Sequence, residues 1–143
     1  GRIRYLGITT SHGRRHEALE QALTRERFDF VQFTCNIVDR EAEARLLPLA
    51  AERGVAVIIN RPLQGGGLCG KVKGKPLPAF AREIDCAGWA QFFLKFIVSH
   101  PAVTCAIPAT SRADHMRENM RAGMGRLPGT AMRERMARHF AGL

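Results

Sequence analysis

The chain has 143 residues, 45% of them hydrophobic, and a formal net charge of +9. This length suits one unit with its own core, and we expect a single unit over residues 1–143. The longest apolar stretch, residues 89–98, is broken by Gln91 and Lys95 and falls short of the roughly 18 residues of a membrane span, so we expect no membrane partner. The arginines are scattered without interleaved aromatic residues, so we also predict no nucleic-acid partner.

The cysteines and histidines predict neither a disulfide framework nor a metal site. The four cysteines are Cys35, Cys69, Cys86 and Cys105, and their wide spacing includes no Cys-x-x-Cys pair. We therefore expect reduced thiols and a cytoplasmic location. His12 and His16 would share a helical face, but no third ligand is placed beside them. The first residues contain no initiator Met and no signal-like pattern, so we expect a protein that is not exported and a chain trimmed from a longer one.

Short apolar runs alternate with helical stretches along the chain. In chain order they predict strands over residues 3–8, 28–33, 55–59 and 104–107, and helices over 12–25, 39–53, 86–99, 112–122 and about 130–140. This order predicts parallel strands joined by helical crossovers. The aromatic stripe of the third helix, Trp89, Phe92, Phe93 and Phe96, is expected to be core. Residues 64–78, rich in Gly, Lys and Pro, are expected to form a mobile loop at the carboxyl ends of the strands.

Four strand–helix units amount to half of an eight-stranded barrel. A doubly wound sheet usually has a G-x-G-x-x-G turn after its first strand, and this chain has none; residues 65–67 follow the third strand with the wrong spacing. A phosphate site after the final strands, at the start of a short helix, is usual in (β/α)8 barrels. We therefore predict an α/β fold, half of a (β/α)8 TIM barrel with about four βα units plus a C-terminal helix.

Residues 107–119, IPATSRADHMREN, are the most informative segment. An apolar strand end passes through hydroxyl residues into an amphipathic helix whose first turns carry Arg112 and His115. Unpaired N–H groups and the helix dipole make such a start favourable for a phosphate. The segment therefore indicates an anion site, and the alternative is an ordinary helix capped by Thr110 or Ser111.

Several segments together resemble the C-terminal half of an aldo-keto reductase. They are YLGITT (residues 5–10), FDFVQFTCNIVDRE (28–41), GVAVIINRPLQGGGL (54–68) and WAQFFLKFIVSHPAVTCAIPATSRADHMRENMRAG (89–123). The last is the most specific, since an I-P-x-[TS]-S strand end leading into a helix with Glu-Asn is more restrictive than any single Gly or Arg motif. The resemblance implies an NADP(H)-dependent oxidoreductase that reduces a small carbonyl substrate by hydride transfer.

The resemblance also implies roles at the nicotinamide and the pyrophosphate. Gln32 resembles the glutamine that hydrogen-bonds the nicotinamide carboxamide, and Thr9 begins the pair that replaces the family's common Ser-Asn. Arg61, Pro62 and Leu63 match the strand exit where the backbone passes near the pyrophosphate. From the residues alone, a glutamine among Val and Phe needs some polar partner, and an arginine after a strand is either a phosphate clamp or an ion-pair partner.

At the adenosine end, the resemblance implies contacts from six residues of the last segment: Thr110, Ser111, Arg112, His115, Glu118 and Asn119. The hydroxyls and positive side chains correspond to the groups that meet the 2′-phosphate, and the Glu-Asn pair to the groups that recognise adenine. Ala109 stands where family members place a lysine, so one phosphate partner is absent. The resemblance therefore favours NADP(H) as the cofactor.

The catalytic groups of the family are not expected in this chain. That chemistry needs a tyrosine with a lysine, an aspartate and a histidine from the earlier strands, and the sole tyrosine, Tyr5, follows no matching motif. We expect the catalytic half to lie outside this chain and the chain alone to be inactive. The alternative is a non-catalytic nucleotide-binding or regulatory half barrel that forms a homo-oligomer to cover its exposed sheet edges.

Overall fold

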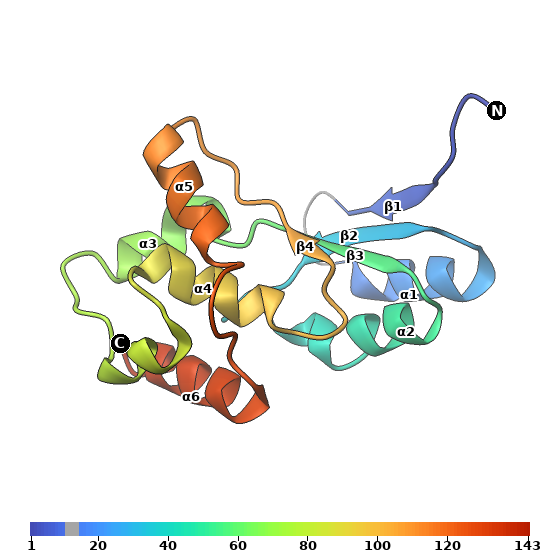
Figure 1. Cartoon of the computed structure of the whole chain (residues 1–143). Coiled ribbons are helices and arrows are strands. Elements are labelled where there is room, and N and C mark those ends of the chain that lie inside the picture. The colour runs from blue at the N-terminus through green and yellow to red at the C-terminus, as the bar shows by residue number, and fades with distance from the viewer. Residues whose placement is uncertain (11–14) are drawn as a thin grey trace.

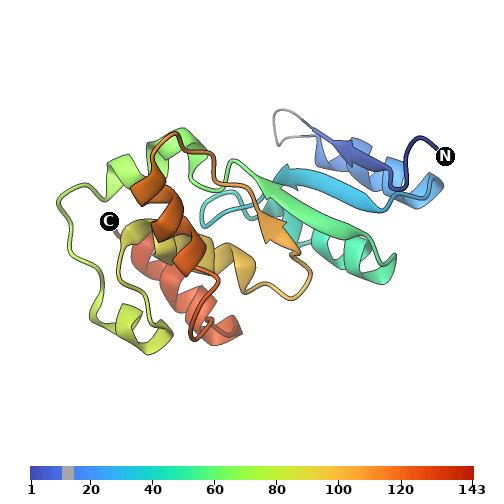
Figure 2. The same ribbon diagram turned by 45° about the horizontal axis from the view of Figure 1, so that its top comes forward.

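A computed structural model describes residues 1–10 and 15–143, in which a parallel sheet is covered by helices on one face (Figure 1). Strands β1 (Gly7–Thr9), β2 (Phe30–Thr34), β3 (Ala56–Asn60) and β4 (Cys105–Ala106) pair in chain order. Each pairing is parallel, as the strand–helix alternation predicted. The strands all run towards the end of the molecule where the later helices gather (Figures 1 and 2).

The helices include the five that the sequence predicted, in the predicted order and with somewhat different bounds, and α3 in addition. They are α1 (His16–Arg25), α2 (Leu46–Glu52), α3 (Gly67–Lys71), α4 (Trp89–Val98), α5 (Ala113–Arg121) and α6 (Thr130–Ala141), with 3₁₀ turns η1 (Glu41–Glu43), η2 (Gln64–Gly66) and η3 (Ala79–Ile84). The start predicted for the first helix, with His12, lies outside the described residues, so the His12–His16 pair is untested. The helix predicted over 39–53 is divided between η1 and α2. Pro48 lies in the first turn of α2, where a missing N–H is tolerated, so α2 begins just before it.

The segment predicted to be a loop over residues 64–78 is partly helical, which corrects that expectation. It holds η2 and α3, and Leu68 and Val72 are 0% and 2% exposed. These two side chains are four residues apart, so they share one face of a helical turn and pack into the core. The Gly, Lys and Pro content of the segment masked this short apolar pair.

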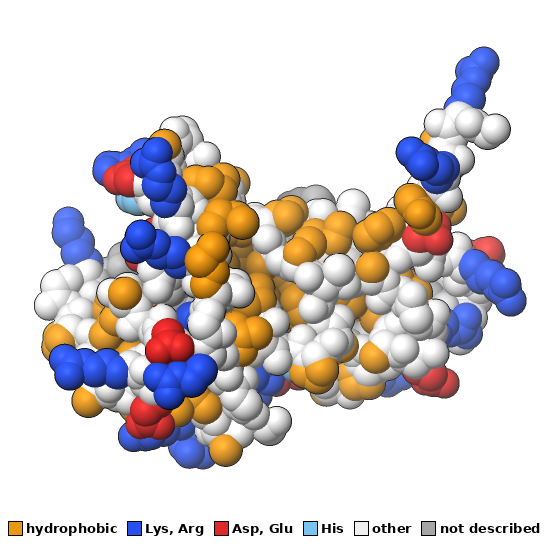
Figure 3. Space-filling model, in the orientation of Figure 1, with side chains coloured by type: hydrophobic (Ala, Val, Ile, Leu, Met, Phe, Trp, Pro, Cys, Tyr) orange, Lys and Arg blue, Asp and Glu red, His pale blue; other side chains and the backbone are white. Residues whose placement is uncertain are grey.

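Alternate residues of each strand face opposite sides of the sheet. Val31, Phe33, Val57 and Ile59 are fully buried against the helices. The strand register places Thr9, Gln32, Ile58 and Cys105 together on the other face, which we call the open face. Figure 3 shows hydrophobic side chains exposed over the strands on this side. The inner side of a half barrel would look like this, since a complete barrel covers it with its remaining strands.

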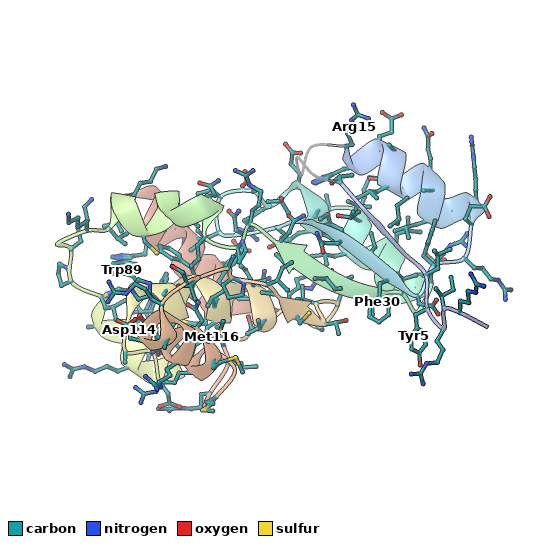
Figure 4. The ribbon with its side chains drawn as sticks, turned by 90° about the horizontal axis from the view of Figure 1, so that it is seen from above. Tyr5, Arg15, Phe30, Trp89, Asp114 and Met116 are labelled. Atoms are coloured by element: carbon teal, nitrogen blue, oxygen red, sulfur yellow. The ribbon has the colours of Figure 1, made fainter. Side chains whose placement is uncertain are left out.

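The first strand is shorter than the predicted run over residues 3–8. Ile3, Tyr5 and Leu6 are 73%, 68% and 51% exposed, so the apolar start of that run has no core to enter. Tyr5 lies against Phe30 with its ring edge-on, 6.0 Å between centroids, and both point to the open face (Figure 4). Pairing of β1 with β2 therefore begins only at Gly7.

A charged network ties α6 to η1 on the helix-covered side. Arg40 donates to Glu43 at 2.7 Å and to Glu134 at 2.6 Å, and Arg133 donates to Glu43 at 2.8 Å. Burial raises the pKa of the Glu43 carboxyl, but the hydrogen bond from Arg40 and the charge of Arg133 outweigh it, leaving the pKa below its ordinary 4.5. None of the described helices is long and apolar enough to cross a membrane.

Candidate functional site

A cavity of about 760 Å³ lies where the β3 exit, α4 and α5 meet. Its volume falls within the ~300–1,000 Å³ typical of small-molecule sites. Seven predicted cofactor residues line it: Arg61, Pro62, Leu63, Thr110, His115, Glu118 and Asn119. The structure thus brings together the two chain segments to which the family resemblance assigned contacts with the pyrophosphate and with the adenosine of the cofactor. We call this space the α5 cavity.

Arg61 stands at the β3 exit with an unusual backbone. Its φ of 47° lies in the left-handed region, which costs a non-glycine residue on the order of 1 kcal/mol. The turn closes when the Gln64 N–H donates to the Arg61 carbonyl at 3.0 Å. The ion pairs among the described residues do not include Arg61, whose side chain is exposed at the cavity wall. This arrangement disfavours the ion-pair alternative and leaves the guanidinium available to an anion.

The start of α5 differs from the predicted cap. Arg112 is the N-cap residue, and no side chain hydrogen-bonds the helix end from that position. Thr110 instead accepts the Arg112 N–H on its hydroxyl at 3.1 Å, which makes a turn just before the helix. The expectation that Thr110 or Ser111 caps the helix is therefore wrong, since both precede the cap. Ser111 is exposed and does not line the α5 cavity.

The guanidinium of Arg112 is held by Asp114. The Arg112 Nη2 and Nε atoms lie 2.6 and 3.1 Å from the Asp114 carboxylate oxygens, and the two side chains are 64% and 60% exposed. The hydrogen bond from Arg112 holds the pKa of the Asp114 carboxyl well below its usual range. Arg112 does not line the cavity. Because its guanidinium already pairs with Asp114, a phosphate at this helix start would compete with the Asp114 carboxylate for it.

Glu118 reaches the N-terminus of α4. Gly88 is the N-cap of α4, and a Cβ atom placed on it would overlap Glu118 Oε1. A carboxylate is favourable there, because the first N–H groups of a helix carry partial positive charge. The bare backbone of Gly88 therefore lets Glu118 sit at the wall of the α5 cavity, beside the buried Asn119.

Trp89 and Cys69 also line the cavity, and the sequence did not single them out for it. Phe92, Phe93 and Phe96 are fully buried, as the aromatic stripe predicted. Trp89 only borders that core: it stacks on Phe93 at 5.8 Å, donates its Nε1–H to the Lys75 carbonyl at 2.8 Å and is half-buried. The position of Trp89 directly after Gly88 was the sequence feature that could have indicated its place at the cavity. Burial raises the pKa of the Cys69 thiol, which disfavours its nucleophilic thiolate form.

Thr9 and Gln32 lie apart from the α5 cavity, on the open face. They are register partners: Thr9 is exposed at the carboxyl end of β1, and Gln32 is half-buried in the middle of β2. Beside them Thr34 donates to Asn60 Oδ1 at 2.6 Å, and Asn60 Nδ2 donates to the Thr10 carbonyl at 3.3 Å. These contacts make a polar rim at the carboxyl ends of the strands. The nicotinamide roles of Thr9 and Gln32 stay predictions.

Comparison with known proteins decides the family. The model of the Aldo/keto reductase family matches residues 1–134. The chain belongs to the aldo/keto reductase family. An uncharacterized oxidoreductase of Schizosaccharomyces pombe is 33% identical over 92 residues, which are 64% of this chain and 29% of that protein. Family membership thus rests on sequence, independently of the fold.

Two solved aldo-keto reductases show the same architecture. The enzyme from Klebsiella pneumoniae, solved with NADP and acetate, matches 98% of this chain and 49% of its own, with a TM-score of 0.77 and 24% identity. The holo form of a Bacillus halodurans enzyme matches 96% of this chain and 50% of its own, with a TM-score of 0.69 and 21% identity. The chain therefore spans about half the length of these aldo-keto reductases, which confirms the predicted half barrel.

Proposed function

We propose that this chain is the cofactor-binding half of an NADPH-dependent aldo-keto reductase. The observation that carries the proposal is the α5 cavity, because one space collects an arginine, a histidine, a hydroxyl, a carboxylate and an amide from the β3 exit and from the segment that leads into and forms α5. Arg61, His115 and Thr110 suit phosphate oxygens, whereas Glu118 and Asn119 suit the edge of a purine base. The NADP bound to the Klebsiella pneumoniae relative supports the choice of nucleotide.

The residues of this chain would hold the cofactor along a path from the cavity to the open face. Thr110, Ser111 and Arg112 would meet the 2′-phosphate, with Arg61 and the backbone of Pro62 and Leu63 near the pyrophosphate. Gln32 and Thr9, which are register partners on β2 and β1, would orient the nicotinamide. When bound, NADPH supplies the hydride that reduces an aldehyde or ketone.

The proton donor of that reduction would come from another part of the protein. Tyr5 is 68% exposed, packs on Phe30 at the start of the sheet, and does not line the α5 cavity. A general acid must lie within hydrogen-bond reach of the reacting oxygen, and Tyr5 precedes the amino end of β1, whereas the nicotinamide is proposed near Thr9 at the other end of that strand. We therefore expect this chain alone to bind the nucleotide without reducing a carbonyl, and the substrate to be set by the missing half.

A second candidate is a nucleotide-binding half barrel that pairs with another copy. It is favoured by exposed apolar side chains next to both edge strands, which are Ile3, Tyr5 and Leu6 before β1 and Ile107 after β4, and by the exposed Met116, Met120 and Met124 on and after α5. Unpaired strand edges with apolar neighbours tend to associate. Sedimentation of the chain separates the candidates, since a dimer that also binds nucleotide favours the second and a monomer the first.

Titration of the chain with NADPH and with NADH, followed by nucleotide fluorescence, tests the first proposal. We expect a dissociation constant for NADPH in the micromolar range. Arg112→Ala should weaken NADPH binding about tenfold and leave NADH binding unchanged, because a charged hydrogen bond to the 2′-phosphate is worth roughly 1.5 kcal/mol. Arg117→Ala removes an exposed charge from the same helix and is the matched control. Equal binding of both nucleotides, with no effect of Arg112→Ala, would contradict the assignment of the 2′-phosphate.

A further inference from the structure

A buried ammonium on α4 holds the segment that follows α5. Lys95 is 0% exposed, and its Nζ donates to the Met124 carbonyl at 2.6 Å and to the Arg126 carbonyl at 3.0 Å. Burying an ammonium is costly unless its donors are used, and these two carbonyls accept from two of its three N–H groups. A lysine kept inside the protein at this cost points to a role that an apolar residue of the same size would not fill.

The carboxylate of Asp85 also binds the segment that follows α5. Asp85 accepts the Arg126 backbone N–H at 2.9 Å and the Arg126 guanidinium at 2.9 and 3.1 Å. Gly125, between the two carbonyls bound by Lys95, has φ of 70°, and a Cβ there would lie 2.9 Å from Asp85 Oδ2. The segment therefore fits between Lys95 and Asp85 only because residue 125 is a glycine.

The same helix α4 also meets α5 at the wall of the α5 cavity. Gly88 leaves room there for Glu118. Gly88 and Lys95 are seven residues apart, which is about 10 Å along a helix. Figures 1 and 2 show α5 beside α4 in both views. Thus α4 lies close against α5 at one point on the cavity wall, and it holds the trailing segment by hydrogen bonds at a second point further along.

We propose that Lys95 is a positioning residue for the nucleotide site, which fixes α5 against α4 so that His115, Glu118 and Asn119 stay on the cavity wall. Lys95 does not line the α5 cavity, so it acts through α5. This inference rests on the proposed function of that cavity. Loss of the two hydrogen bonds frees the segment after α5, and the helix can then shift its cavity-lining side chains by fractions of an ångström.

Arg133 of α6 offers a matched control that also contacts α4. Its side chain is 7% exposed, its Nε donates to the Phe96 carbonyl at 2.9 Å, and it pairs with Glu43. It is a buried cation bonded to a backbone carbonyl, as Lys95 is, but its partners lie on α4 and η1 and not at α5. A purely structural role predicts similar consequences for the loss of either cation.

The experiment compares Lys95→Met, Lys95→Arg and Arg133→Met by thermal unfolding, by amide hydrogen exchange and by titration with NADPH. Both Met variants should unfold at lower temperature. Lys95→Met alone should speed exchange in residues 113–126 and weaken NADPH binding on the order of tenfold, since small displacements of binding groups are costly. Lys95→Arg keeps donors and charge and should recover most of the affinity.

Two results would overturn the inference: NADPH binding by folded Lys95→Met equal to the original chain, or an equal loss of affinity in Arg133→Met. If Lys95→Met does not fold, Lys95→Gln, which keeps an N–H donor, replaces it in the same comparison. Failure of the original chain to bind NADPH would count against the proposed function and not against the positioning of α5 by Lys95. Hydrogen exchange then decides alone: faster exchange confined to residues 113–126 in Lys95→Met supports this positioning role, and unchanged exchange rejects it.

Discussion

The α5 cavity and the open face of the sheet belong to the same parallel strands, but this chain supplies very different shares of their surroundings. The cavity is lined by the β3 exit, α4 and α5; Gly88 leaves room for Glu118 of α5, and Lys95 hydrogen-bonds the segment that follows α5. The open face has Gln32 and Thr9 at its rim, with Phe30 half-buried and Tyr5 exposed beside them. A nucleotide on this chain would therefore find its adenosine end enclosed and its ring end on an uncovered sheet.

The difference between the cavity and the open face shows which contacts of a barrel are made within one half and which are made between the two halves. Residues on the helix side of β2 and β3 reach full burial inside this chain, because their partners are the crossover helices next in sequence. Residues on the inner side depend on strands across the barrel, which are far away in sequence. Half a barrel can thus contain one complete end of a site and only one wall of the other end.

The largest expected effect compares the two sides of β2. Phe33→Ala should lower the free energy of unfolding by about 3–5 kcal/mol, as for other buried phenylalanines. Phe30→Ala, on the open face, should cost only about 1 kcal/mol, because its ring is half-buried. Denaturant unfolding measures both, and Phe33→Leu serves if Phe33→Ala does not fold. Similar losses for the two alanine variants would mean that the open face is covered in solution, as pairing of two copies requires.

The charged network on the helix side gives the next largest effect. The folded pKa of Glu43 lies below 4.5, so the unfolded chain takes up the proton first as the pH falls. The stability that the network adds is fully present above about pH 4.5 and is lost as the pH falls through the folded pKa. Glu43→Gln should cost about 1–3 kcal/mol at pH 7 and flatten this acid dependence in unfolding curves measured from pH 7 to 3.

The control for that network is Glu83, whose carboxylate pairs with Arg135 at 3.2 Å where both side chains are at least half exposed. Glu83→Gln should change stability by less than about 0.5 kcal/mol and keep the acid dependence, since exposed ion pairs contribute little. An equal acid dependence in Glu43→Gln and the original chain would show that Glu43 does not titrate as its contacts predict.

A smaller effect tests the wall of the α5 cavity. Gly88→Ala should displace the Glu118 carboxylate and weaken NADPH binding about fivefold. The stability change should be about 1 kcal/mol or less, because Gly88 has an extended backbone that alanine can adopt and the atom its Cβ meets is the end of a side chain. Gly129 is the N-cap of α6 and has open space at its Cβ position, so Gly129→Ala is the matched control. Equal NADPH affinities of the two variants would show that Glu118 does not contribute to nucleotide binding.

The smallest expected effect concerns the ring end. Gln32→Ala should change NADPH affinity of this chain by no more than about twofold, since a neutral hydrogen bond in open solvent is worth little. The same fluorescence titration measures it. A tenfold loss would show that the open face already holds the nicotinamide firmly without the rest of the barrel.

Most of the fold could be predicted from the sequence, because the spacing of local apolar runs indicates the alternation of strands and helices. The bounds failed where local composition misled: Leu68 and Val72 form a short apolar pair inside a polar segment, and Ile3 to Leu6 form an apolar run without a core. The collection of Arg61, Thr110 and Glu118 around one cavity follows from the family resemblance, and no local pattern contains it. The pairing of Arg112 with Asp114 and the support of α5 by Lys95 depend on side-chain geometry, so sequence reasoning missed both.

Competition between the two ends of the nucleotide tests the central claim most directly. NADPH bound to this chain is titrated with adenosine 2′,5′-bisphosphate and, separately, with nicotinamide mononucleotide, and the nucleotide fluorescence is followed. A complete adenosine end predicts that the bisphosphate displaces NADPH with a dissociation constant within about tenfold of that of NADPH, whereas nicotinamide mononucleotide displaces none at equal concentration. Displacement by nicotinamide mononucleotide, with no effect of the bisphosphate, would contradict the account.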